Sequence, residues 1–182
     1  MRNLKPEVGI VMGSDSDWPV VKECVDTLAG FGVPCEARVI SAHRSPALAA
    51  GYGSTAARRG IKVIIAAAGG AAHLGGVLAA HTTLPVIGIP ATGGALNGVD
   101  ALLATLQMPA GIPVATVTLG SAGPVNAALL AVQMLAIGRP YLARKLARHK
   151  ADLQRKVRKG DAKIQAEMRM SPATQGRGGS VP

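Results

Sequence analysis

Three short segments hold the side chains of this sequence that are best suited to chemistry. They are residues 13–17, 41–44 and 69–76, and each follows an apolar run. In the second segment, His43 can exchange a proton near neutral pH, and the neighbouring Arg44 can bind a phosphate through its planar guanidinium. These residues predict a site that binds a phosphate-bearing ligand and transfers a proton.

The segment 13–17, Gly-Ser-Asp-Ser-Asp, offers hydroxyls and backbone N–H groups at the start of a predicted helix. Unpaired donors and the helix dipole both favour an anion there. In the alternative, Asp17 is simply the N-cap of that helix, while Ser14 and Ser16 fill a turn, and this alternative is favoured from the loop alone. The segment is not a P-loop, because the lysine of that motif is absent. For residues 41–44 the alternative is a solvated loop, which a second polar loop nearby makes less attractive.

The segment 69–76 contains no charged residue, so its contribution would be backbone N–H groups and close approach to a planar ring or carboxylate. A hydrogen-bonded structural role and a catalytic role are equally open for His73. His81 and His149 are interpreted as packing or surface residues. The sequence shows no catalytic triad order, no paired carboxylates and no metal-ligand cluster, and two cysteines are too few for a zinc site or a disulfide framework.

The pattern of apolar runs predicts a scaffold that would bring the three segments together. Strand-like runs alternate with Ala- and Leu-rich helical segments in five β-α repeats. Because the strands are too apolar to leave one face in water, we expect an α/β fold, a three-layer αβα doubly wound parallel sheet of flavodoxin or Rossmann type. Ligands bind beyond the carboxyl ends of the strands in such sheets. The predicted strands are 8–12, 36–40, 62–68, 85–89 and 114–119.

The C-terminal part of the chain is predicted to be an extra, basic helix. Residues 139–182 carry 12 basic and 3 acidic residues, a net +9, whereas residues 1–138 carry 8 and 7, a net +1. Apolar residues at alternating spacings of 4 and 7 keep one narrow stripe on a helix; they are Leu142, Leu146, Leu153, Val157, Ile164 and Met168. The predicted parts are a catalytic domain (1–138), a basic helix that packs on the domain or a neighbouring subunit (139–170) and a flexible tail (171–182).

Composition narrows the partners and the location. The 182 residues have a net charge of +10 but are only 2% aromatic, and proteins that bind RNA or single strands usually stack the bases on aromatic rings. We therefore expect no specific nucleic acid, although a nucleic-acid-binding module is the rival hypothesis. With neither a membrane-spanning run nor a secretion signal, a cytoplasmic protein without a membrane partner is expected. The apolar helix predicted at 124–137 and the stripe predict a homo-oligomer, because one small domain would struggle to bury both.

These segments resemble the class I 5-(carboxyamino)imidazole ribonucleotide mutases of purine biosynthesis. The resemblance is carried by the runs at 13–17 and 41–44 (Ser-Ala-His-Arg) and by Ala-Gly-Gly-Ala-Ala-His-Leu at 68–74, and it extends over roughly residues 8–160. It implies an isomerase that moves a carboxylate from N5 to C4 of a phosphorylated aminoimidazole ribonucleotide, with no metal or other cofactor, in a homo-octamer.

The resemblance also implies a role for each residue of the site. His43 would be the catalytic residue: it would protonate the departing nitrogen and later remove the proton from the ring carbon. The substrate phosphate would be held by Ser16, Ser41 and Arg44, and the ribose hydroxyls by Asp17. The residues surrounding the aminoimidazole and its carboxylate would be Ser14, Ala42, Gly69, Gly70, His73 and Leu74.

Two features depart from the pattern of the family, and a third feature, which follows that pattern, bears on the choice of reaction. Many members have a proline where this chain has Gly75, which would loosen the loop over the ring, and the stretch 92–95 is smaller than in many members. Ser-Ala-His-Arg, in place of a lysine-containing version, favours the mutase over a related carboxylase. That carboxylase, which joins free carbon dioxide to aminoimidazole ribonucleotide, is the alternative activity.

Overall fold

The computed structural model describes residues 5–93 and 95–171. The rest of the predicted tail, 172–182, and Gly94 of the stretch 92–95 lie outside these ranges. Five parallel strands form one sheet in the order β2-β1-β3-β4-β5. Their bounds are β1 (Val8–Met12), β2 (Cys35–Val39), β3 (Val63–Ala68), β4 (Val86–Pro90) and β5 (Ala115–Thr116). This order confirms the predicted doubly wound parallel sheet, in which the chain reverses its direction of travel across the sheet beside β1.

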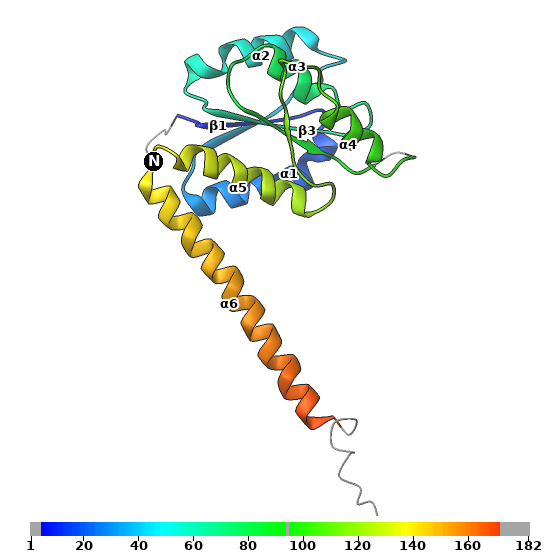
Figure 1. Ribbon diagram of the computed structural model, residues 1–182. Coiled ribbons are helices and arrows are strands. Elements are labelled where there is room, and N and C mark those ends of the chain that lie inside the picture. Colours follow the sequence, from blue (N-terminus) through cyan, green and yellow to red (C-terminus); the bar gives the residue numbers. More distant parts are fainter. Residues whose placement is uncertain (1–4, 94, 172–182) are drawn as a thin grey trace, which may run out of the picture. The chain divides into compact units, whose positions relative to one another are not determined.

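Helices cover both faces of the sheet (Figure 1). On one face α1 (Trp18–Phe31) packs against α5 (Ala122–Ala136), and on the other α2 (Pro46–Arg59) packs against α3 (Leu74–Ala80). A fifth helix, α4 (Val99–Leu106), contacts β4 and β5. Every residue of β1 and β4 is buried, as expected for strands covered by helices on both sides.

The edges of the sheet differ from the prediction. β2 lies at one edge and leaves Arg38 and Val39 exposed, so the expectation that every strand is covered on both faces is wrong for this one. At the other edge, β5 pairs with β4 through Ala115 and Thr116 alone, which makes it much shorter than the predicted 114–119. An edge strand has a neighbour on one side only, so apolar composition is a weaker guide to its length and burial.

Helix α6 (Pro140–Met170) contains most of the basic C-terminal part of the chain. Its first residues, to Leu142, belong to the same compact unit as the sheet, and Leu142 is buried there; the helix from Ala143 onward belongs to a second unit. Within that second unit the apolar stripe is exposed at Val157 (72%) and Ile164 (53%). Among the described residues, no helix is both long and apolar enough to cross a bilayer.

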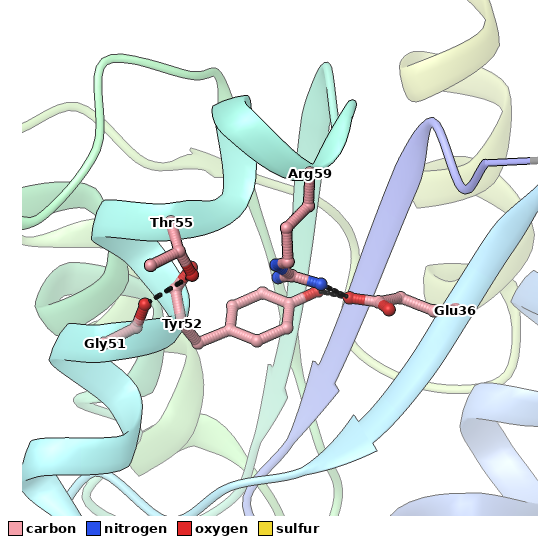
Figure 2. A network of polar contacts seen from close by, with 5 residues as sticks. All are labelled: Glu36, Gly51, Tyr52, Thr55 and Arg59. Carbon is pink, nitrogen blue, oxygen red and sulfur yellow. Dashed lines mark hydrogen bonds and ion pairs between the residues drawn. The ribbon is translucent and has the colours of Figure 1, made fainter.

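A polar network joins β2 to α2, the two elements on either side of the loop that contains His43 (Figure 2). Glu36 on β2 accepts a hydrogen bond from Tyr52 Oη (2.9 Å) and forms an ion pair with Arg59. The Arg59 guanidinium carbon lies 4.5 Å from the Tyr52 ring centroid, a cation–π distance. Burial alone would raise the pKa of Glu36, but the bonds from Arg59 and Tyr52 and the nearby positive charges outweigh it and lower this pKa.

The same tyrosine requires a glycine on β1. A Cβ atom built at Gly9 would lie 2.1 Å from Tyr52 Oη and 3.2 Å from its Cζ. No side chain fits at that distance, so Gly9 allows Tyr52 to lie across β1 and still reach Glu36 on β2.

Gly9→Ala should therefore lower the free energy of unfolding by about 1–3 kcal/mol through overpacking. In a Tyr52→Phe background, which lacks the hydroxyl, the same substitution should cost clearly less. Denaturant unfolding of the four proteins measures both costs, with Gly30→Ala as a control at a helical glycine that has no atom within 4 Å of the new Cβ. An equal cost in both backgrounds would show that the hydroxyl is not the obstacle.

Candidate functional site

A cavity of about 560 Å³ lies beyond the carboxyl ends of β1, β2 and β3. Nine of the eleven residues that the sequence singled out line it, and the two that do not are Ser16 and Gly70. The cavity also has three lining residues that were not singled out, Gly13, Ala68 and Ala71. These three are small and lack a reactive group, and their position beside the polar residues was the one signal in the sequence that could have indicated them.

The loop after β1 is held by its own side chains. Ser14 N donates a hydrogen bond to Asp17 Oδ2 (3.1 Å), and Ser16 N donates to Ser14 Oγ (3.3 Å). This capping box closes the single 3-10 turn Asp15–Asp17. Asp17 does occupy the N-cap position of α1, as the simpler alternative predicted, but within the described residues its side chain makes no capping bond to that helix and bonds Ser14 N instead. Burial raises the pKa of the Asp17 carboxyl, although the bond from Ser14 opposes the shift.

Ser16 is fixed by this loop rather than by the cavity wall. Its hydroxyl donates to Ser14 Oγ at 2.8 Å. Because Ser14 does line the cavity, Ser16 contacts the site through that hydroxyl. Asp17 lines the cavity as well, next to the turn that holds it.

Arg44 links the loop after β2 to the loop after β1. Its backbone N–H donates to Ser41 Oγ (3.1 Å), and its Nη2 donates to the carbonyl oxygen of Gly13 (3.3 Å). Among the ion pairs found in residues 5–93 and 95–171, none includes Arg44. A guanidinium that is oriented by neutral acceptors keeps its charge for a ligand, so this wall of the cavity can bind an anion.

The two histidines of the cavity contact each other. His43 Nε2 lies 2.8 Å from His73 Nδ1, and the ring centroids are 4.9 Å apart in an edge-to-face arrangement. His43 belongs to the loop after β2, while His73 directly precedes α3. Both rings are exposed to the cavity. The sequence left the role of His73 open, and it gave no sign that a ring 30 positions away would be its partner.

The remaining wall of the cavity is small and uncharged. Gly69 and Leu74 line it beside Ala42, and a Cβ at Gly69 would come within 3.6 Å of the Ala91 carbonyl oxygen. Gly70, with a φ of 59°, adopts a left-handed conformation that favours glycine and turns the chain toward His73. Gly75, the departure from the family pattern, is buried in the first turn of α3.

The described part of the chain contains neither a metal-ligand cluster nor a reactive thiol at Cys24. No three His, Cys, Asp or Glu side chains gather there as a group that could hold a metal ion. Burial, with a smaller contribution from Cys35, raises the pKa of the Cys24 thiol to about 12, so this thiol is protonated and unreactive. The groups that can act in the cavity are therefore the histidine pair, Arg44, Asp17 and the serine hydroxyls.

Comparison with known proteins gives one consistent match. The family model described as AIR carboxylase matches residues 7–156. A Pyrococcus horikoshii protein named N5-carboxyaminoimidazole ribonucleotide mutase is 56% identical over 157 residues, which cover 86% of this chain and 88% of that protein. A Bacillus subtilis protein of the same name is 57% identical over 143 residues, or 79% and 88% of the two chains. The crystal structure of Treponema denticola PurE has a TM-score of 0.78 at 27% identity and covers 87% of this chain and 98% of its own.

Removal of the Arg44 guanidinium should weaken the binding of a phosphate monoester. Arg44→Ala removes a charge-assisted hydrogen bond worth about 1.5–3 kcal/mol, so we expect the Kd for ribose 5-phosphate to rise about tenfold or more. Isothermal titration at fixed ionic strength measures it. The control is Arg58→Ala, which removes an exposed arginine of α2 outside the cavity. A similar loss in both variants would mean that the phosphate responds to overall charge and not to this cavity.

Proposed function

This chain belongs to the AIR carboxylase family, as the resemblance predicted, and we propose that it is a mutase of de novo purine biosynthesis. Its substrate is the N5-carboxylated aminoimidazole ribonucleotide, and its product carries the carboxylate on C4. The observation that carries the proposal is a single cavity in which a histidine pair, an arginine without a carboxylate partner among the described residues and an uncharged wall occur together. The names of the relatives, at 56% and 57% identity, support the mutase over the carboxylase.

The polar side of the cavity would bind the ribose phosphate. We assign the phosphate to Arg44, Ser41 and Ser16, and the ribose hydroxyls to Asp17. The contact of Arg44 with Ser41 Oγ supports this assignment, because both groups then face the same anion. Ser16 does not line the cavity, and its hydroxyl donates to Ser14 Oγ. For Ser16 to bind the phosphate, the loop after β1 would therefore have to adjust when the ligand binds.

The uncharged side of the cavity would hold the aminoimidazole. Ala42, Gly69 and Leu74 line the cavity and offer no nucleophile, while Gly70 would act from the turn beside Gly69. Ser14 and His73 would offer hydrogen bonds to the carboxylate. When the N5–carboxylate bond breaks, its electron pair stays on the aminoimidazole and carbon dioxide is released into this space. A wall without a competing nucleophile favours recapture of that molecule at C4, which makes the second step effectively intramolecular.

His43 would carry the proton between the two steps. It donates a proton to N5 as the carbamate bond breaks. Carbon C4 then attacks carbon dioxide, and His43 removes the proton from the tetrahedral C4, which restores the aromatic ring. One proton leaves the histidine and one returns, so the reaction needs no external acid, base, oxidant or reductant.

We also propose a homo-oligomer, and by resemblance to the family an octamer. The apolar stripe of α6 supports this proposal, because its residues Leu153, Val157 and Ile164 are exposed in the described part of the second unit. Val157, Ile164 and Met168 continue the stripe beyond residue 156, where the match to the family ends. The catalytic domain at 1–138, the packing of the helix 139–170 and a cytoplasmic location stay predictions.

His43→Asn should abolish conversion of the N5-carboxylated substrate while the protein stays folded. General acid–base catalysis contributes about 100- to 10,000-fold, so a loss in that range is expected. Chromatographic measurement of product gives the rate, and circular dichroism checks the fold. The control is His81→Asn, because His81 lies outside the cavity at the end of α3. If His43→Asn turns over like the control, His43 is not the proton-transfer residue.

A further inference from the structure

The hydrogen bond between His43 and His73 fixes which nitrogen of His43 is available to a ligand. Nε2 of His43 faces Nδ1 of His73 at 2.8 Å, so one hydrogen lies between the two rings. The nitrogen of His43 that remains for a ligand is Nδ1. In a neutral imidazole one nitrogen carries the proton and the other is the acceptor, and the partner of the first nitrogen decides which is which.

The proposed reaction requires one particular arrangement of these protons. After His43 has given a proton to N5, its Nδ1 must carry a lone pair that can accept the proton from C4. A neutral His43 has that lone pair only if its remaining proton is on Nε2. His73 accepts a hydrogen bond from that position if its own proton is on Nε2 and its Nδ1 carries a lone pair.

The other charged groups of the cavity are occupied elsewhere. Asp17, from the turn before α1, accepts a hydrogen bond from Ser14 N, and Arg44, from the same loop as His43, bonds Gly13 and Ser41. No other lining residue of the cavity carries a charge. Among the described residues, His73 is therefore the group of the cavity wall that orients the His43 ring.

We propose that His73 is a positioning residue for proton transfer. It holds the proton of neutral His43 on Nε2 and directs Nδ1 toward the substrate. Two fully protonated rings would place N–H groups against each other at 2.8 Å, which would break the contact. This inference rests on the proposed function, because it assigns the pair a part in that reaction.

Two substitutions of His73 separate positioning from packing. His73→Leu removes the acceptor, whereas His73→Gln keeps an acceptor oxygen on a side chain of similar reach. For the leucine variant we expect kcat to fall about 10- to 100-fold with KM changed less than about threefold, and for the glutamine variant a substantial recovery of kcat.

A second measurement does not depend on turnover. Long-range ¹H–¹⁵N spectra of the histidine rings in the full chain report the tautomer of each ring. We expect neutral His43 to carry its proton on Nε2, and we expect a mixture of both tautomers after His73→Leu. His81→Leu, which changes a histidine outside the cavity, should leave the His43 signals and kcat as they are.

The outcomes distinguish this inference from the proposed function. If the wild-type protein does not convert the N5-carboxylated substrate, the proposed function fails, and the ring spectra still decide whether His73 sets the tautomer. An unchanged kcat in His73→Leu, a His43 proton on Nδ1 in the wild type, or no recovery of kcat by glutamine would each overturn the positioning role. If the leucine variant does not fold, the wild-type tautomer and the kcat of the glutamine variant decide.

Discussion

The parallel pairing of β1 with both of its neighbours is the constraint on which the site depends. Met12, the last residue of β1, is paired with Val39 on β2 and with Ala67 on β3. The three strands therefore end at nearly the same level, and the chain must leave each of them at one edge of the sheet. Because the chain passes from β1 to β2 on one side and places β3 on the other, the loops after all three strands border one space. The network of Glu36, Tyr52 and Arg59 joins β2 to α2, the elements directly before and after the loop that contains His43.

Within that space the chemistry is divided by polarity. Its lining includes Arg44 and the serine hydroxyls, which suit an anion, together with Ala42, Gly69 and Leu74, which offer no charge and no nucleophile. Such a cavity can fix a phosphorylated ligand at one end and leave room at the other for a small neutral molecule. The histidine pair lies in the same cavity, so proton transfer and retention of carbon dioxide can take place at one site.

The fold and the grouping of the loops could be predicted from the sequence because both follow from local pattern. Apolar runs and glycine-rich breaks indicate β-α repeats, and parallel strands in a doubly wound sheet bring their carboxyl ends together. Contacts between side chains of different loops do not follow from such patterns. Asp17 was open to interpretation as an ordinary N-cap, yet its carboxylate closes a turn with Ser14. The contact of His43 with His73 depends on the path of two loops, and the short β5 depends on its edge position.

The central claim is that the carboxylate stays in the cavity while it moves from nitrogen to carbon. The most direct test uses substrate labelled with ¹³C in the N5 carboxylate, turned over in an excess of unlabelled bicarbonate, with the isotope content of the C4 carboxylate measured by mass spectrometry. Our account predicts that most of the label is retained in the product. Complete replacement by unlabelled carbon would show that free carbon dioxide is the reactant, and it would contradict the mutase in favour of the carboxylase.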